Sequence, residues 1–397
     1  MSRVKIVATI GPRTNDAETL KAMLEAGMSI ARLNASHATL DWHRDDLALI
    51  RQTVPAVPVL LDVPGRKIRT RKREHALKFS AGDKVVLTTN AVTAEPSSVI
   101  VDYPTLHEDV DIGDMILIDD GRLHLTVTEV DGPDVICRAG NSGMLVDAKG
   151  VNVPRLKPRP DFLSARDRDL VSFAMRHDVD FIGLSYVDSA ADVRAVRALI
   201  GDRAPKIVSK IETQGALDNL GEIMAVSDAL MVDRGDLSVE TNLETVALSQ
   251  KRILLEARRA AIPVIVATEI LHSMIDSPWP TKAEVSDITT AVLDHAAALM
   301  LSGETAMGAF PVEAVATMRR VADTASDFLQ DSMDQGSGAS LDQVPEAMGE
   351  AIALICRRLD VTKIVAITIS GYAARMVSAR TPRQPIIAVT NDPGAAR

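Results

Sequence analysis

Short runs of apolar residues alternate with segments of helical periodicity along most of this chain, and this alternation constrains the fold more than any other feature. Apolar strands that alternate with helices are typical of a parallel sheet covered by helices on both faces. Eight such units predict a closed (β/α)8 barrel, with a doubly wound open sheet as the alternative. The apolar runs lie at residues 5–10, 28–34, 57–62, 179–185, 206–212, 229–234, 263–268 and 297–302.

A different pattern occupies residues 70–152. Leu123, Leu125 and Val127 alternate there with polar residues, and turn sequences such as Asp131-Gly-Pro break the segment into short pieces. Strict alternation between turns is typical of half-buried strands. We therefore predict a small all-β insertion between two parts of the barrel.

The pattern divides the chain into a barrel, an insertion and a C-terminal part. Residues 1–69 and 153–333 form the barrel, on either side of the insertion at 70–152. A polar segment with Gly and Ser at 334–340 precedes residues 341–397, which contain one helical segment and two apolar runs. Two strands are too few to bury a core of their own, so we expect a truncated C-terminal α/β domain.

Composition narrows the class of protein. Hydrophobic residues make up 46% of the 397-residue chain, but no apolar run approaches the roughly 18 residues that span a bilayer. A formal net charge of −10 argues against non-specific binding of nucleic acid. Cys137 and Cys356 lie far apart and predict neither a disulfide framework nor a cysteine metal site. Because a strand begins almost at Met1, we expect no signal peptide and a cytoplasmic protein.

Polar residues stand at the C-terminal ends of seven of the eight predicted strands. Those strand ends meet at one face of a (β/α)8 barrel, where the active sites of such barrels lie. A cluster of acids, cations and hydroxyl groups at this face therefore predicts an active site. Its members are Arg32, Asn34, Ser36, Asp62, Ser185, Lys210, Glu212, Asp236, Thr268, Ser302 and Glu304.

Lys210 and Glu212 are two positions apart near the end of one strand, so their side chains share a face. A cation beside a carboxylate suits the binding of a phosphoryl group with its Mg²⁺, although an ordinary ion pair at a solvated strand end has the same spacing. Asp236 adds a carboxylate for Mg²⁺ or Mn²⁺, and the segment beginning at Gly235 offers backbone N–H groups to an anion. No phosphate-binding loop, dinucleotide motif or zinc-ligand spacing occurs.

Nine segments of the chain resemble those of the pyruvate kinase family and occur in the family's order. They are residues 8–12, 31–37, 118–121, 149–154, 209–212, 231–237, 267–268, 280–284 and 300–306. Each is weakly specific alone, but chance does not place all of them in one order. The resemblance implies a barrel with a β lid after its third strand and a C-terminal α/β domain. It also implies phosphoryl transfer from phosphoenolpyruvate to ADP, which gives pyruvate and ATP in glycolysis (ATP:pyruvate 2-O-phosphotransferase activity).

The resemblance also implies roles for the residues at the barrel mouth. Lys210 and Arg32 are expected to bind and stabilise the phosphoryl group, and Glu212 and Asp236 to hold Mg²⁺ or Mn²⁺. The expected substrate-binding residues are Arg32, Lys210, Gly235, Asp236 and Thr268.

Further roles concern the proton and the nucleotide. The resemblance places Thr268 beside the enolate, and Ser302 with Glu304 in the relay that delivers a proton to the methylene carbon. The expected nucleotide-binding residues are Asn34, His37, Arg69, Asp120 and Lys149.

The loop after the third strand bears on the need for a monovalent cation. The family's K⁺ site matches Asn34, Ser36, Asp62 and Val63. Lys67, however, stands where K⁺-independent members of the family carry a lysine. A fixed ammonium there supplies the charge that K⁺ otherwise brings, so we expect activity without K⁺.

Several positions beside the chemistry depart from the family pattern and leave the substrate open. They are Ala35, Ala38, Thr213, Glu269 and the run at 64–66. Glu269 adds a negative charge next to Thr268 unless it pairs with a cation such as Lys282. A kinase of the same fold that acts on another enol or 2-hydroxy acid is therefore an alternative to pyruvate kinase.

The C-terminal end departs further. Ala373 stands where the family's effector loop has a hydroxyl group, and the segment that follows this loop in the family is missing. This permits a third hypothesis, a catalytically silent regulatory paralogue, which the complete catalytic set disfavours. The truncation exposes apolar surface around Ile367 and Ile386, so we expect a homo-oligomer.

Overall fold

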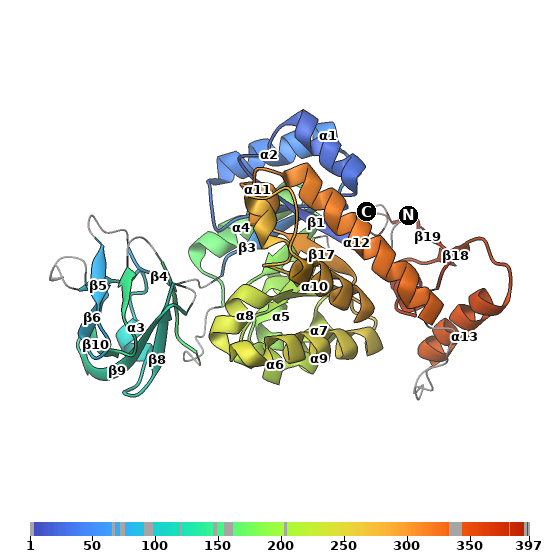
Figure 1. The fold of residues 1–397 in the computed structure, drawn as a ribbon. Coiled ribbons are helices and arrows are strands. Elements are labelled where there is room, and N and C mark those ends of the chain that lie inside the picture. The colour runs from blue at the N-terminus through green and yellow to red at the C-terminus, as the bar shows by residue number, and fades with distance from the viewer. Residues whose placement is uncertain are drawn as a thin grey trace.

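The computed structural model describes residues 4–65, 68–71, 76–90, 98–119, 121–145, 149–154, 162–201, 205–332, 344–380, 382–392 and 395. A central barrel lies between an all-β domain, on the left in Figure 1, and a small C-terminal α/β domain on the right. Arg66, Lys67, Asp120 and the polar segment at 334–340 lie outside the described residues.

Eight parallel strands close into a barrel, as predicted, which excludes the open sheet. They are β1 (Lys5–Ile10), β2 (Ile30–Asn34), β3 (Val59–Val63), β13 (Phe181–Leu184), β14 (Lys206–Ile211), β15 (Ala229–Asp233), β16 (Val264–Ala267) and β17 (Ala298–Leu301). Neighbours pair in the order β1-β17-β16-β15-β14-β13-β3-β2, and β2 pairs back with β1. Each predicted strand is present, and its ends shift by no more than two residues.

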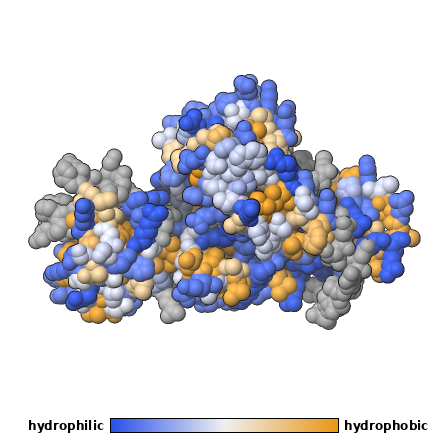
Figure 2. Space-filling view, viewed as in Figure 1, coloured by the Kyte–Doolittle hydropathy of each residue, from blue (hydrophilic) through white to orange (hydrophobic). Residues whose placement is uncertain are grey.

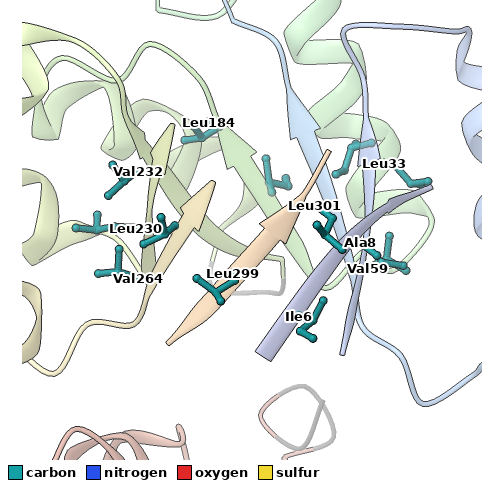
Figure 3. Close-up of a cluster of buried hydrophobic side chains, with 14 of the residues drawn as sticks. Ile6, Ala8, Leu33, Val59, Leu184, Leu230, Val232, Val264, Leu299 and Leu301 are labelled. Atoms are coloured by element: carbon teal, nitrogen blue, oxygen red, sulfur yellow. The ribbon is translucent and has the colours of Figure 1, made fainter. Parts of the chain in front are cut away.

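Both faces of the barrel strands are buried, which explains why the strands are nearly continuous apolar runs in the sequence. Ile6 and Ala8 of β1 belong to the main core between the strands and the helices, together with residues such as Leu299 (Figure 3). Val7, which lies between them in sequence, belongs to a smaller core with Met231. The site is therefore built on strands that packing fixes from two sides.

Helices follow the barrel strands and cover the outside of the barrel (Figure 1). Capping boxes begin α4 (Ala165–Arg176) and α10 (Lys282–Leu293). Within the described ranges, none of the helices combines the length and the hydrophobicity needed to span a lipid bilayer. The others around the barrel are α1 (Ala17–Ala26), α2 (Leu40–Thr53), α5 (Ala190–Ile200), α6 (Gln214–Asp218), α7 (Leu220–Val226), α8 (Arg234–Glu240), α9 (Val246–Arg259), α11 (Gly303–Ala306), α12 (Pro311–Ser332) and the 3₁₀ turns η1 (Leu243–Thr245) and η2 (His272–Ile275).

The insertion has its own hydrophobic core, separate from that of the barrel. Its elements are β4 (Ile68–Arg69), β5 (Leu77–Phe79), β6 (Lys84–Thr88), β7 (Val99–Ile100), α3 (Leu106–Asp109), β8 (Met115–Ile118), β9 (Leu123–Asp131), β10 (Asp134–Ala139), β11 (Gly143–Leu145) and β12 (Gly150–Asn152). The main sheet has the order β4-β12-β8-β9-β10-β6-β7, and β11 pairs with β5. In β9, buried Leu123, Leu125 and Val127 alternate with exposed residues, as predicted. The sheet already includes β4, which starts before the expected boundary at residue 70.

The C-terminal domain is small and incompletely buried. Its elements are α13 (Val344–Arg358), β18 (Ile364–Ile367), α14 (Tyr372–Ser378) and β19 (Ile386–Val389). The two strands form a two-stranded parallel sheet. Ile367, the last residue of β18, is 83% exposed, and the nearby Ile369 is 80% exposed. Figure 2 shows hydrophobic atoms, in orange, at this right-hand end of the molecule. The expected apolar surface is present at Ile367, whereas Ile386 is only partly exposed.

Gly11, directly after β1, lets the backbone approach α11 closely. A Cβ atom here would lie 2.6 Å from the carbonyl oxygen of Ala306 and 2.8 Å from its Cα. We expect Gly11→Ala to lower the free energy of unfolding by about 1–3 kcal/mol, because the backbone must shift. Gly221→Ala in α7 is the control: its Cβ meets nothing within 4 Å, and alanine favours a helix by up to about 1 kcal/mol. Denaturant unfolding of both variants is the measurement, and equal stabilities would contradict the prediction.

Candidate active site

A cavity of about 340 Å³ lies at the C-terminal ends of the barrel strands, where the sequence predicts the active site. All of the predicted mouth residues except Glu212 and Glu304 line it: Arg32, Asn34, Ser36, Asp62, Ser185, Lys210, Asp236, Thr268 and Ser302. Further polar residues of its wall include Tyr186, Asp233 and Glu269. The closed barrel thus brings together side chains that are far apart in the sequence.

Lys210, on β14, is the centre of the charge network. Its ammonium lies 2.8 Å from Oδ2 of Asp233 and 3.1 Å from Oε2 of Glu212. It also donates a hydrogen bond of 3.1 Å to Oγ of Ser185. The predicted pairing of Lys210 with Glu212 is confirmed, and because both side chains are buried, an ordinary solvated ion pair is excluded.

Burial and charge act against each other in this network. Burial lowers the pKa of the Lys210 amine, but Asp233, Asp62 and Glu212 outweigh it and raise that pKa well above its ordinary value. Burial raises the pKa of Glu212 to about 8, while Lys210 opposes this rise and Asp236 adds to it. The repulsion among these acids favours the binding of a further cation.

Three carboxylates form the candidate metal site. Glu212, Asp233 and Asp236 each offer one oxygen, and these oxygens lie within 4.8 Å of one another. Such a donor set fits Mg²⁺ or Mn²⁺, which bind carboxylates together with substrate oxygens and water. From the sequence, Glu212 and Asp236 are predicted as ligands, but Asp233 is not. The signal for Asp233 is alternation, because Met231 belongs to the inner core of the barrel and a residue two positions later shares its face.

Arg32, on β2, is held in one orientation by buried partners. Its Nε and Nη2 donate to Oδ2 of Asp62 at 2.9 and 2.7 Å, and its Nη1 donates to Oγ1 of Thr9 at 2.8 Å. The other oxygen of Asp62, Oδ1, makes no hydrogen bond to any residue that the structure describes and lies 3.9 Å from the Lys210 ammonium. Asp62, which the resemblance assigns to a K⁺ site, is thus already next to two cations.

The other residues assigned to the K⁺ site have ordinary surroundings. Oδ1 of Asn34 accepts a hydrogen bond of 3.1 Å from the N–H of Ser36. Val63 is buried within β3. Lys67, on which the expected independence of K⁺ rests, lies outside the described residues.

Thr268 connects the end of β16 to the start of α8. Its Oγ1 accepts a hydrogen bond of 2.9 Å from the N–H of Gly235 and donates one of 2.7 Å to the carbonyl of Ala267. Thr268 and Glu269 have φ angles of +66° and +54°, a conformation that side-chain-bearing residues rarely adopt. The Gly235 N–H, which the sequence analysis expects to bind an anion, is therefore already bonded in this structure.

Ser302 and Glu304, expected to act together, occupy different environments. Oγ of Ser302 is buried without a hydrogen-bond partner, and the residue lines the cavity. The carboxylate of Glu304 accepts hydrogen bonds from the N–H groups of Leu271 at 3.2 Å and Ser302 at 2.8 Å. Glu304 is buried and joins the loops after β16 and β17, so it fixes the backbone of Ser302.

Glu269 lies exposed at the rim of the cavity. Across the described residues, neither Lys282 nor any other cation forms an ion pair with it, so the condition under which its charge would be offset is not met there. The nearby Arg234 has other partners: it donates a hydrogen bond of 2.6 Å to the Thr268 carbonyl and forms an ion pair with Asp287 at 2.6 Å. The negative charge of Glu269 at the cavity is therefore not neutralised by a neighbouring side chain.

The residues expected to bind the nucleotide are not gathered at the cavity. Asn34 lines it, and His37 is exposed in the loop that follows β2. Arg69 and Lys149 belong to the insertion, where the Lys149 ammonium lies 3.0 Å from the carboxylate of Asp119.

Tyr186 contacts two of the three carboxylates of the candidate metal site, although the sequence does not predict Tyr186 as a site residue. Its backbone N–H donates to Oε1 of Glu212 at 2.6 Å, and its hydroxyl donates to Oδ1 of Asp236 at 3.2 Å. Burial raises the pKa of the phenol well above its ordinary value, and Asp236 adds to the rise. A single tyrosine at a strand end carries no sequence pattern that separates it from a core residue.

Two family models match the chain. The model described as "Pyruvate kinase, barrel domain" matches residues 1–315, and the model described as "Pyruvate kinase, alpha/beta domain" matches residues 346–397. Together they account for the barrel with its insertion and for the short C-terminal domain.

Individual proteins agree with this match. The chain is 39% identical over 407 positions to a pyruvate kinase of Geobacillus stearothermophilus, with 100% of this chain and 69% of the relative covered. It is 36% identical over 402 positions to a pyruvate kinase of Thermococcus litoralis, covering 98% of this chain and 85% of the relative. A crystal structure of a pyruvate kinase from Cryptosporidium parvum superimposes with a TM-score of 0.90 at 34% identity, over 100% of this chain and 84% of that one.

Removal of the central cation is the direct test of this charge network. We expect Lys210→Met, in the presence of a chelator, to lower the free energy of unfolding by about 3–5 kcal/mol, because buried carboxylates lose their partner. Lys206→Met is the matched control on the same strand, since the Lys206 side chain is 44% exposed and lies 3.9 Å from Asp228. Denaturant titration of both variants is the measurement. Equal free energies of unfolding for Lys210→Met and Lys206→Met would show that Lys210 does not stabilise the buried carboxylates.

Proposed function

Because this chain belongs to the pyruvate kinase family, it is a phosphotransferase of the pyruvate kinase type, and we propose that its barrel mouth transfers the phosphoryl group of phosphoenolpyruvate to ADP. The products are pyruvate and ATP, the products of the corresponding step of glycolysis. Of the three functions that the sequence leaves open, the comparisons support this one.

The observation that carries the proposal is the burial of two cations beside three closely spaced carboxylates. Lys210 and Arg32 supply fixed positive charge at one cavity, and Glu212, Asp233 and Asp236 supply oxygen ligands beside it. A phosphoryl group with its divalent ion needs both kinds of partner. Hydrocarbon-binding or purely structural cavities need neither.

We assign Arg32 to the binding of phosphoryl oxygens and Lys210 to the stabilisation of the group during transfer. Asp62 holds the Arg32 guanidinium with two hydrogen bonds, and Asp233 holds the Lys210 ammonium. Cations that are fixed before the substrate arrives need little reorganisation during the reaction. Thr268 lines the cavity, and we propose that it lies beside the enolate.

Glu212, Asp233 and Asp236 are the residues that would hold Mg²⁺ or Mn²⁺. When bound, the ion neutralises charge on the phosphoryl oxygens. The carboxylates orient it from the ends of adjacent strands, β14 and β15, which the barrel fixes in register. We add Asp233 to the two ligands expected from the sequence.

Ser302 is our candidate for the proton relay to the methylene carbon, because the residue lines the cavity and its buried hydroxyl has no hydrogen-bond partner among the described residues. Glu304 supports this role through the Ser302 N–H. For the nucleotide we propose Asn34 and His37 on the barrel. The remaining nucleotide-binding residues belong to the insertion, namely Arg69, Asp120 and Lys149, so the insertion acts as a lid that closes and excludes water.

We also propose that the chain works as a homo-oligomer in the cytoplasm. The exposed apolar side chains beside the C-terminal sheet, among them Ile367 and Ile369, give a second copy a surface to cover.

A coupled assay of purified protein with Mg²⁺, ADP and phosphoenolpyruvate tests the proposed reaction. We expect turnover that requires Mg²⁺ or Mn²⁺, and a kcat at least about a hundredfold lower in Glu212→Gln and in Asp236→Asn, because each change removes a metal ligand. Glu222→Gln, an exposed position on α7, is the control and should leave kcat unchanged. Pyruvate formation no faster than that of Lys210→Met would refute the reaction, and normal rates in the ligand variants would refute the metal assignment alone.

A second assay concerns the monovalent cation. We expect equal rates in tetramethylammonium and K⁺ buffers at equal ionic strength, because Lys67 supplies a fixed charge and Asp62 is already paired with Arg32. Lys67→Glu should create a requirement for K⁺, whereas Lys78→Glu, the same charge change at an exposed position of β5, should not. Strong stimulation of the unmutated enzyme by K⁺ would show that the Asn34, Ser36 and Asp62 region binds an ion after all.

A further inference from the structure

Tyr186 occupies an unusual position directly after strand β13. Its φ angle is +55°, in the left-handed region that residues with side chains seldom enter. It follows Ser185, whose N–H still bonds to the Val63 carbonyl of the neighbouring strand at 3.3 Å. The chain therefore leaves the barrel sheet at Tyr186 and turns back over the cavity, where this residue forms part of the wall.

The turn directs the Tyr186 backbone N–H at Glu212. This N–H donates to Oε1 at 2.6 Å, while Oε2 of the same carboxylate lies 3.1 Å from the Lys210 ammonium. Each oxygen of Glu212 thus has its own partner, from a different strand end. The carboxylate plane is fixed by two contacts, and a strained backbone conformation persists where surrounding contacts of this kind hold it.

The side chain of Tyr186 reaches the second carboxylate. Its hydroxyl donates to Oδ1 of Asp236 at 3.2 Å. One residue thus contacts both Glu212 on the β14 side and Asp236 at the start of α8, through two groups that stand at opposite ends of a rigid aromatic side chain.

We propose that Tyr186 is a positioning residue, which sets the separation and orientation of Glu212 and Asp236 for a small divalent ion. The inference rests on the metal site of the proposed function and adds a selectivity role to it. Groups that hydrogen-bond to metal-binding carboxylates orient them, and removal of such a group weakens metal binding.

The size of the ion decides how much this orientation matters. Mg²⁺ and Mn²⁺ need near-octahedral oxygen ligands at short distances, whereas Ca²⁺ accepts more ligands in flexible arrangements. A carboxylate released from the Tyr186 hydroxyl can still serve Ca²⁺, but it serves the smaller ions poorly. The hydroxyl therefore favours Mg²⁺ and Mn²⁺ over Ca²⁺.

Tyr186→Phe isolates the hydroxyl, because the ring and the backbone N–H remain. Dissociation constants are measured on the full chain without substrate: Mn²⁺ from the signal of the free ion in electron paramagnetic resonance, and Mg²⁺ and Ca²⁺ by competition. We expect the constants for Mn²⁺ and Mg²⁺ to rise about tenfold or more in Tyr186→Phe, and that for Ca²⁺ by less than about threefold.

Tyr103→Phe is the matched control. Tyr103 in the insertion also donates its hydroxyl to a carboxylate, Oδ2 of Asp109, at 2.7 Å. This variant loses the same kind of hydrogen bond far from the carboxylates of the barrel mouth, so its metal constants should equal those of the unmutated protein. A circular dichroism spectrum of each variant shows that the fold is retained.

The outcomes separate the inference from the proposed function. Unchanged Mn²⁺ binding in Tyr186→Phe, or equal weakening for Mg²⁺ and Ca²⁺, overturns the positioning role alone. If the unmutated protein binds no Mn²⁺ at all, the metal assignment of the proposed function fails, and the role of Tyr186 fails with it. Selective weakening in Tyr186→Phe, with normal binding in Tyr103→Phe, supports both.

Discussion

The arrangement of charged side chains at this barrel mouth depends on one lysine ammonium buried among carboxylates. The Lys210 ammonium lies 2.8 Å from Asp233, 3.1 Å from Glu212 and 3.9 Å from Asp62, so one buried cation is the partner of three acids, and its removal would leave them without compensation for their burial. Burial, together with the neighbouring Asp236, raises the pKa of Glu212 even though Lys210 opposes the rise. The barrel mouth thus combines closely spaced carboxylate groups, where a divalent ion would bind, with the fixed cations Lys210 and Arg32, where a phosphoryl group would lie.

The sequence predicts the barrel well because the barrel imposes a simple rule on it. Strands such as β1 are packed on both faces, with Ile6 in one core and Val7 in the other, so most residues of the strand are apolar and the strand is easily recognised in the sequence. The strands of the insertion have only one buried face, so buried and exposed residues alternate in β9. The same logic places polar strand-end residues at one mouth, and most of those predicted line the cavity.

The site features that the sequence does not predict depend on backbone conformation or on side chains from other strands. Asp233 is the last residue of β15, where the polar strand-end rule applies as it does to Asp236, and the Lys210 ammonium at 2.8 Å identifies it as part of the site. The role of Tyr186 depends on a positive φ angle, and among residue types only glycine signals such an angle in a sequence. Glu304 lies in a motif with Ser302 but turns away to hold backbone N–H groups. The position of the insertion beside the barrel depends on contacts between distant parts of the chain, such as the 2.8 Å hydrogen bond that the Asn152 amide donates to Glu240, and no local pattern encodes such contacts.

The pairing of the first strand with the last has a consequence for how the chain is made. Lys5 of β1 lies opposite Ala298 of β17, and the hydroxyl of Thr9 donates to the carbonyl of Leu301 across 292 positions of sequence. During synthesis the outer edge of β1 therefore has no partner until β17 leaves the ribosome, whereas the insertion, with its separate core, has all of its strands long before. Nascent chains of this protein expose an unpaired parallel edge for most of their elongation, and that interval is when they most need protection from aggregation.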